Sequence, residues 1–271
     1  MSAPDPRELL ALAQEAALRA GALLLKRFES GHERAVASKS TPTDPVSEAD
    51  LEAQRTIRDL IGERRPSDAF LGEEEGADQP GETGLRWIVD PLDGTVNFLY
   101  GITQWSVSVA VGDGGGTVAG VVHSPAMGET FTALRGGPAT RNGVELRSRA
   151  ADAPPLARAL IATGFSYDAS LRAEQGEVVA RLLPRVRDIR RAGSAALDLA
   201  GVALGRFDAY YERGINAWDI TAGALICTSA GLEVQPIPGG IVVAPPALLG
   251  ELLAIVAAAP NSTAGAEWTA V

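Results

Sequence analysis

Sulfur and imidazole ligands are scarce in this chain of 271 residues, which contains one cysteine and two histidines. Cys227 cannot form a disulfide within the chain, and a chain without such bonds fits a reducing compartment. His32 and His123 are too few for a histidine-rich zinc site. If the protein binds a metal ion, we therefore expect carboxylate ligands.

Long apolar runs are also missing. No stretch reaches the roughly 18 apolar residues that a membrane-spanning helix needs. Residues 1–7 carry Pro and Asp where a signal peptide would be basic and then apolar. We therefore predict a cytoplasmic protein without a membrane partner.

Positive charge is in deficit, because the net charge is −10 at pH 7. Such a balance argues against general affinity for nucleic acids and favours a site that attracts cations. Five arginines gather as a local exception: Arg181, Arg185, Arg187, Arg190 and Arg191. They could form a basic patch for an RNA or protein partner, and the alternative is an ordinary solvated face.

An acidic turn stands out among the features that are present. Residues 87–98 form an apolar run that brings Asp90 and Asp93 into a turn. Two carboxylates three residues apart can converge on a hard cation such as Mg²⁺. Gly94 allows close approach, and a helix that begins near Thr95 would offer free N–H groups to a phosphate. The alternative is a strand that ends in an Asp-Pro turn with a capping aspartate.

Three other acids lie at the ends of expected elements. Asp50 stands three residues after a serine that can cap a helix, so a capping box is the alternative to metal binding. Glu73 directly follows a short apolar strand and is well placed to share a cation with Asp90, although a charged loop is equally consistent. Asp219 lies in the first turn of a helix, where an acid is ordinary.

Two halves with different patterns are expected. Residues 1–147 contain two amphipathic helices followed by antiparallel strands, which predicts an α+β half with one continuous sheet. Residues 148–271 alternate strands and helices, which predicts an α/β half, and the two halves should pack tightly as one unit. The loop 38–46 contains Lys39, which could neutralise phosphate or could simply be solvated.

Together these segments resemble the inositol monophosphatase family of Mg²⁺-dependent, lithium-sensitive phosphatases. Residues 87–100 match the first family signature in full, and residues 218–231 match the second, with Thr221 where the family has Ala or Cys. The resemblance covers residues 39–231. It implies a mixed α+β and α/β architecture, a layered αβαβα sugar-phosphatase fold with an antiparallel N-terminal sheet and a mixed C-terminal sheet.

The resemblance also implies a site that holds two or three Mg²⁺ ions through oxygen ligands. The implied ligands are Glu73, Asp90, the Leu92 carbonyl, Asp93, Asp219 and, near a third and weaker ion, Asp50. Glu73 and Thr95 would orient the attacking water, and Asp90 would bridge two metals. N–H groups of Gly94 and Thr95 would bind phosphate, and substrate hydroxyls would meet Asp93, Ala195 and Glu212.

The expected activity is Mg²⁺-dependent hydrolysis of inositol monophosphates, such as inositol 1-phosphate, by a metal-activated water. Ser166 cannot be aligned securely with the serine that touches inositol in some members, so the substrate stays open. The same chemistry could act on histidinol phosphate, fructose 1,6-bisphosphate, NADP or adenosine 3′,5′-bisphosphate.

Two other classes of function compete with this enzyme. The arginine cluster is the basis for a regulatory protein that binds RNA or the transcription machinery. A structural Ca²⁺ site would predict metal binding without turnover. The resemblance further implies a homodimer.

Overall fold

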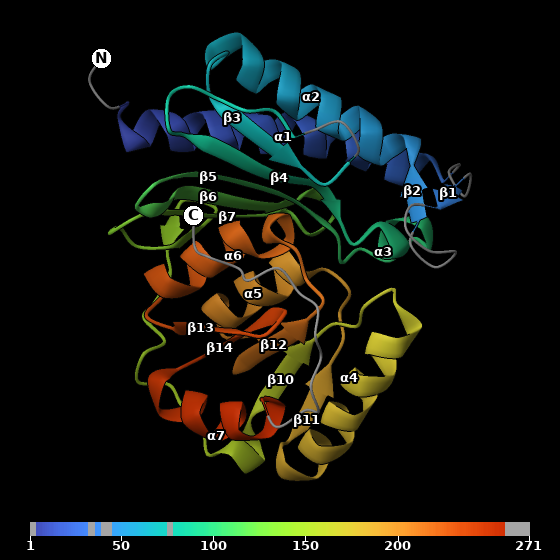
Figure 1. Cartoon of the computed structure of the whole chain (residues 1–271), viewed down its shortest axis with the longest axis vertical. Helices are drawn as coiled ribbons and strands as arrows, with labels where there is room; N and C mark the ends of the chain where they lie inside the picture. Colours follow the sequence, from blue (N-terminus) through green and yellow to red (C-terminus); the bar gives the residue numbers. More distant parts are fainter. Residues whose placement is uncertain (1–3, 32–35, 39–44, 75–77, 258–271) are drawn as a thin grey trace.

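The computed structural model describes residues 4–31, 36–38, 45–74 and 78–257. In these residues, helices and sheets alternate in five layers (Figure 1). The helices are α1 (Pro6–Ser30), α2 (Glu48–Arg64), α3 (Thr95–Leu99), α4 (Ala169–Leu182), α5 (Ala195–Leu204), α6 (Ala217–Ser229) and α7 (Pro246–Val256). Short 3-10 turns cover η1 (Pro125–Met127), η2 (Leu156–Arg158) and η3 (Leu183–Arg185). The layered αβαβα expectation is confirmed.

The larger sheet has the strand order β3-β4-β5-β6-β7-β8-β9. Its strands are β3 (Ala69–Gly72), β4 (Arg86–Asp93), β5 (Ser106–Asp113), β6 (Gly116–Ser124), β7 (Glu129–Leu134), β8 (Thr140–Arg141) and β9 (Val144–Glu145). From β4 onward every neighbouring pair is antiparallel, as expected.

Strand β3 corrects one part of that expectation, because it pairs in parallel with β4. Residues 78–85, which precede β4, run back along β3, where Phe70 and Gln79 exchange two backbone hydrogen bonds of 2.9 and 2.7 Å. This return brings the chain to the end at which β3 began, so β4 must run in the same direction.

The smaller sheet is mixed, as expected, with the order β11-β10-β12-β14-β13. Its strands are β10 (Leu160–Thr163), β11 (Asp188–Arg190), β12 (Ala209–Arg213), β13 (Glu233–Ile237) and β14 (Gly240–Ala244). Strand β10 is parallel to β11 and β12, whereas β14 is antiparallel to β12 and β13. All its strands follow residue 147, so each sheet comes from one side of the predicted boundary; the division into halves itself stays a prediction.

Helices cover both faces of the larger sheet. Helices α1 and α2 pack on one face, and α5 and α6, which come from the second half of the chain, lie between the two sheets (Figure 1). Because helices cover both faces of the sheet, β4 and β5 are buried on both faces at every position except Arg86 and Asp113, which are partly buried. Trp87 and Trp105 are fully buried there.

A short antiparallel pair, β1 (Val36–Ser38) and β2 (Pro45–Ser47), flanks the predicted loop 38–46. The end of the predicted loop therefore belongs to strand β2. Lys39 and His32 lie outside the described residues. Among the helices that the structure describes, none combines the length and apolar character required to span a membrane.

Candidate active site

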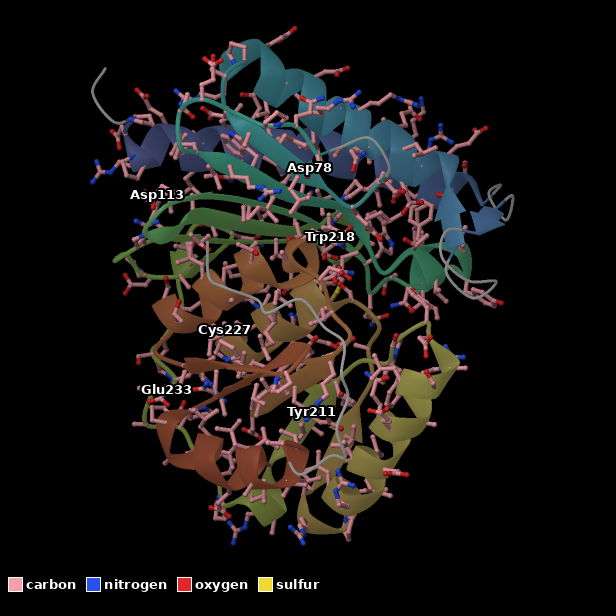
Figure 2. The ribbon with its side chains drawn as sticks, in the orientation of Figure 1. Asp78, Asp113, Tyr211, Trp218, Cys227 and Glu233 are labelled. Carbon is pink, nitrogen blue, oxygen red and sulfur yellow. The ribbon has the colours of Figure 1, made fainter. Side chains whose placement is uncertain are left out.

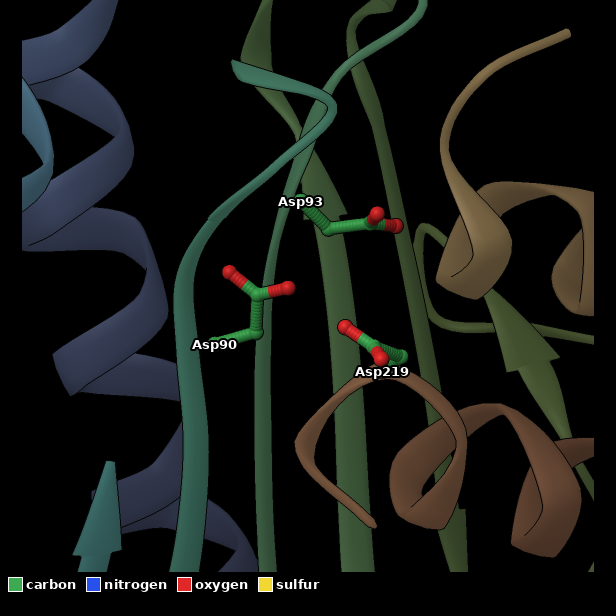
Figure 3. A group of neighbouring side chains, drawn as sticks. All are labelled: Asp90, Asp93 and Asp219. Atoms are coloured by element: carbon green, nitrogen blue, oxygen red, sulfur yellow. The ribbon is translucent and has the colours of Figure 1, made fainter. Parts of the chain in front are cut away.

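Strand β4 carries Asp90 and Asp93 to its carboxyl end. Side chains three residues apart on a regular strand point to opposite faces. Here Asp90 pairs with Ser108 and Asp93 with Ser106, so β4 has one more residue than β5 in this interval. Such a bulge turns the strand. Both carboxylates consequently point toward the same space (Figure 3).

The third acid, Asp219, comes from the start of α6. Its Oδ2 accepts a 2.8 Å hydrogen bond from the Asn216 N–H in a capping box. Ser108, which pairs with Asp90, donates a 3.2 Å hydrogen bond to the Trp218 carbonyl (Figure 2 shows Trp218 beside the larger sheet). This contact anchors the beginning of α6 directly beside Asp90.

One oxygen from each of Asp90, Asp93 and Asp219 lies within 4.8 Å of the others. The three side chains point toward one another from β4 and α6 (Figure 3). All three donors are carboxylate oxygens, which suit hard divalent cations such as Mg²⁺. The cluster therefore fits the metal site that the sequence predicted.

The same acids repel one another when no cation is present. Burial raises the pKa of Asp90 well above its ordinary value, and the charges of Glu73, Asp93 and Asp219 raise it further. Burial and the charge of Glu73 likewise raise the pKa of Asp219. Glu73 thus lies close enough to act on both. A bound cation would relieve this repulsion.

Three hydrogen bonds from the beginning of α5 hold Asp93. The Ser194 hydroxyl and the Ala196 N–H donate to its Oδ2 at 2.5 and 2.8 Å, and the Ala195 N–H donates to its Oδ1 at 3.2 Å. Burial raises the pKa of Asp93 to about 6, although these hydrogen bonds oppose the shift. The N-terminus of α5 therefore holds the Asp93 carboxylate, one of the metal ligands that the resemblance implies.

Asp50 is fully buried and joins α2 to the acidic turn. Its Oδ2 accepts hydrogen bonds from the N–H and hydroxyl of Ser47, which confirms the capping box. Its Oδ1 accepts a 2.8 Å hydrogen bond from the hydroxyl of Thr95, which also lies 3.1 Å from the Leu92 carbonyl. These contacts orient Thr95, and a metal-ligand role for Asp50 stays a prediction.

Gly94 has a left-handed backbone, with φ of 96°. A Cβ added there would lie 3.0 Å from the Gln104 carbonyl oxygen and 3.1 Å from that of Gly193. The glycine therefore lets this turn lie directly against the backbone of Gln104 and against the backbone of Gly193, just before α5.

We expect Gly94→Ala to lower the free energy of unfolding by about 1–3 kcal/mol and to reduce activity. Gly143→Ala is the matched control, because Gly143 has φ of 77° but a Cβ there would meet open space. Chemical denaturation and initial rates of both variants test this. Equal losses of activity in the two variants would contradict a role for close packing at Gly94.

A cavity of about 480 Å³ connects the acids with the second half. The predicted site residues that line it are Glu73, Asp90, Leu92, Asp93, Gly94, Thr95, Ala195, Glu212 and Asp219. Residues 164–168, including Ser166, also line it. Asp50 contacts this set through Thr95 and does not itself line the cavity.

Glu212 lies on the opposite side of this cavity from strand β4. Its Oε2 accepts a 2.6 Å hydrogen bond from the Tyr210 hydroxyl. Burial raises the pKa of Glu212 to about 7, and the Tyr210 hydrogen bond opposes that shift. A carboxyl group near its titration point can both donate and accept hydrogen bonds, as contact with a hydroxyl group requires.

Sequence reasoning missed Ser194, Tyr210, Arg191 and Asp198 as parts of this site. Ser194 was visible as a helix N-cap, because a serine before a small-residue helix is a common cap. No local pattern indicates that its hydroxyl also reaches Asp93, since that contact spans 101 positions.

Cys227 and most of the arginine cluster lie outside the cavity, which only Arg191 of these residues lines. Cys227 is buried in the helix layer between the sheets, where burial raises the pKa of its thiol (Figure 2). It is inert, as expected. Arg181 is partly buried, with its Nε enclosed, while Arg185, Arg187, Arg190 and Arg191 are exposed.

Comparison with known proteins places the chain in a family. The model of the inositol monophosphatase family matches residues 5–269. "Inositol-1-monophosphatase SuhB" of Mycobacterium tuberculosis is 42% identical over 280 residues, which cover 94% of this chain and 96% of the relative. "Nus factor SuhB" of Escherichia coli is 38% identical, covering 86% of each chain.

A solved structure has the same architecture. The extragenic suppressor protein suhB of Bartonella henselae superposes with a TM-score of 0.85 at 33% identity, covering 92% of this chain and 98% of the other. The family match extends over nearly the whole chain and includes strand β4 and helix α6, which carry the three acids. The chain therefore belongs to the inositol monophosphatase family and is a phosphoric monoester hydrolase.

Proposed function

We propose that this protein hydrolyses inositol monophosphates, inositol 1-phosphate in particular, with Mg²⁺ as its cofactor. The observation that carries the proposal is the convergence of Asp90, Asp93 and Asp219 beside Gly94 and Thr95 in one cavity. Relatives named inositol-1-monophosphatase, at 42% identity, support the choice of substrate.

The groups proposed to bind the cation through oxygen all line the cavity: Glu73 directly after β3, Asp90, the Leu92 carbonyl and Asp93 on β4, and Asp219 in α6. When bound there, Mg²⁺ supplies charge neutralisation of the phosphate and acidification of a water molecule. Since these ligands come from both halves of the chain, cation binding should also tighten the contact between β4 and α6.

The chain's own groups would position the reactants. N–H groups of Gly94 and Thr95 would donate to the phosphate, because the first N–H groups of a helix have no intrahelical acceptor. The Thr95 hydroxyl, held by Asp50, and the Glu73 carboxylate would orient the attacking water, which requires no covalent intermediate on the protein. The Ala195 backbone, Asp93 and Glu212 would meet substrate hydroxyls.

Initial rates of phosphate release test the substrate. The panel contains inositol 1-phosphate, histidinol phosphate, fructose 1,6-bisphosphate, NADP and adenosine 3′,5′-bisphosphate, each with and without Li⁺. We expect the highest kcat/KM for inositol 1-phosphate and inhibition by Li⁺, which resembles Mg²⁺ in size. A higher kcat/KM for another compound of the panel would identify that compound as the preferred substrate and would leave the proposed reaction class unchanged.

A second function is favoured by one observation, the 38% identity to a relative named Nus factor SuhB. We infer that Arg185, Arg187, Arg190 and Arg191, which are exposed, would provide its contact surface. Capture of transcription proteins by the wild-type chain, lost when these four residues are replaced by Ser, would support it. If the variant captures the same proteins as the wild type, the arginine surface does not provide this contact.

A homodimer and a cytoplasmic location complete the proposal. The sequence's low cysteine content is consistent with a reducing compartment. Analytical ultracentrifugation at micromolar concentration should give twice the chain mass of 28.1 kDa, and a single species of the chain mass would contradict the dimer.

A further inference from the structure

Asp198 is a buried acid of helix α5. The residue lines the active-site cavity and also a neighbouring cavity of about 280 Å³, although it is only 2% exposed. Among the described residues, no hydrogen bond or ion pair to its carboxylate is found. A buried carboxylate without partners costs stability, so its presence calls for an explanation.

Capping of α5 does not supply that explanation. Asp93 already accepts hydrogen bonds from the N–H groups of Ala195 and Ala196. The Ser194 hydroxyl accepts one from Leu197. The N–H of Asp198 itself donates to the Ser194 carbonyl within the helix. The free donors at this helix end are thus satisfied without the Asp198 side chain.

The position of Asp198 relates it to the predicted substrate contacts. Asp198 lies three residues after Ala195, and residues at this spacing share one face of a helix. Both line the cavity, as do Glu212 and Arg191. Burial raises the pKa of Asp198, the charges of Glu212 and Asp93 raise it further, and the charge of Arg191 opposes the shift. Asp198 and Glu212 therefore act on each other within the same cavity.

We propose that Asp198 is a specificity-determining residue that forms a hydrogen bond with a ring hydroxyl of a phosphorylated polyol, next to the hydroxyl held by Glu212. The inference rests on the proposed function, since it concerns the same cavity. Adjacent hydroxyls of a polyol offer both donors and acceptors, so they satisfy either protonation state of the two carboxyl groups. A phosphomonoester with an aryl leaving group such as p-nitrophenyl has no ring hydroxyl to donate to these carboxyl groups.

The test compares kcat/KM for inositol 1-phosphate with kcat/KM for p-nitrophenyl phosphate, both in saturating Mg²⁺. In Asp198→Ala we expect the ratio of the two values to fall about tenfold, mainly through KM for inositol 1-phosphate, because one hydrogen bond to a charged group is lost. Asp198→Asn, which keeps one acceptor, should give a smaller fall. Asp188→Ala removes an exposed aspartate outside the cavity and should leave the ratio unchanged.

Thermal unfolding separates this role from a structural one. Removal of an unpaired buried carboxylate should leave Tm unchanged or raise it in both Asp198 variants. An unchanged ratio, or a lowered Tm with equal losses on both substrates, would overturn the proposal. If the wild type releases no phosphate from inositol 1-phosphate, the proposed function fails separately. In that case the ratio is measured with the polyol phosphate that the wild type hydrolyses fastest in place of inositol 1-phosphate. A ratio that Asp198→Ala leaves unchanged would again overturn the role of Asp198.

Discussion

Asp90→Asn is expected to reduce kcat/KM for inositol 1-phosphate by a factor on the order of 10³ or more, because it would remove one carboxylate ligand of the proposed cation, which would neutralise the phosphate. The amide has the same shape and can still accept the 2.9 Å hydrogen bond from the Leu92 N–H, so the turn should fold. Phosphate release with saturating Mg²⁺ measures the loss.

The same substitution should increase the stability of the metal-free protein, although it lowers the activity. Without a cation, Asp90 is buried among Glu73, Asp93 and Asp219, whose charges repel its own. We therefore expect the metal-free Asp90→Asn protein to have a higher Tm than the metal-free wild type at pH 8, and to lose the rise in Tm that Mg²⁺ causes. Asp78→Asn, at an exposed position, is the control. An active Asp90→Asn protein that needs no metal would contradict the mechanism.

The metal-free protein is also expected to lose stability as the pH rises from 5 to 8. In an unfolded chain Asp and Glu titrate near pH 4. In the folded protein the pKa of Asp93 is about 6 and that of Glu212 about 7. Between these limits the folded state binds more protons than the unfolded state, so the free energy of unfolding falls as the pH increases.

The size of this effect follows from the shift of Glu212, which corresponds to about 3 kcal/mol. For a chain of this length that free energy lowers Tm by on the order of 10 °C. Thermal melts in EDTA at pH 5 and pH 8 measure it, and saturating Mg²⁺ should restore Tm at pH 8. Glu212→Gln should flatten the pH dependence. A Tm that rises or stays constant between pH 5 and 8 would contradict the electrostatics of the cavity.

The acidic turn could be predicted from the sequence because the residues that form it are close together in the chain. Asp90, Asp93 and Gly94 lie within five positions, and the alternation of apolar and turn residues marks the end of a strand. The structure brings Asp219 to them, as the two signatures implied. Their action as metal ligands stays a prediction.

What could not be predicted depends on long-range packing. The bulge that turns Asp90 and Asp93 to the same side is defined by the register with β5, which a single strand does not reveal. The parallel pairing of β3 with β4 is accompanied by a bridge between Phe70 and Gln79, which no local sequence pattern indicates. Asp198 looks like an ordinary acid near a helix start, and only burial without a partner distinguishes it.

Dependence on a divalent cation tests the central claim most directly. The measurement is the initial rate of phosphate release from inositol 1-phosphate by EDTA-treated wild-type protein, as Mg²⁺ is added back. If Asp90, Asp93 and Asp219 hold the catalytic cation, the rate should be at background without Mg²⁺ and should increase to saturation as Mg²⁺ binds. A rate that persists in EDTA, or binding of Mg²⁺ with no phosphate release from any phosphomonoester in the panel, would contradict it.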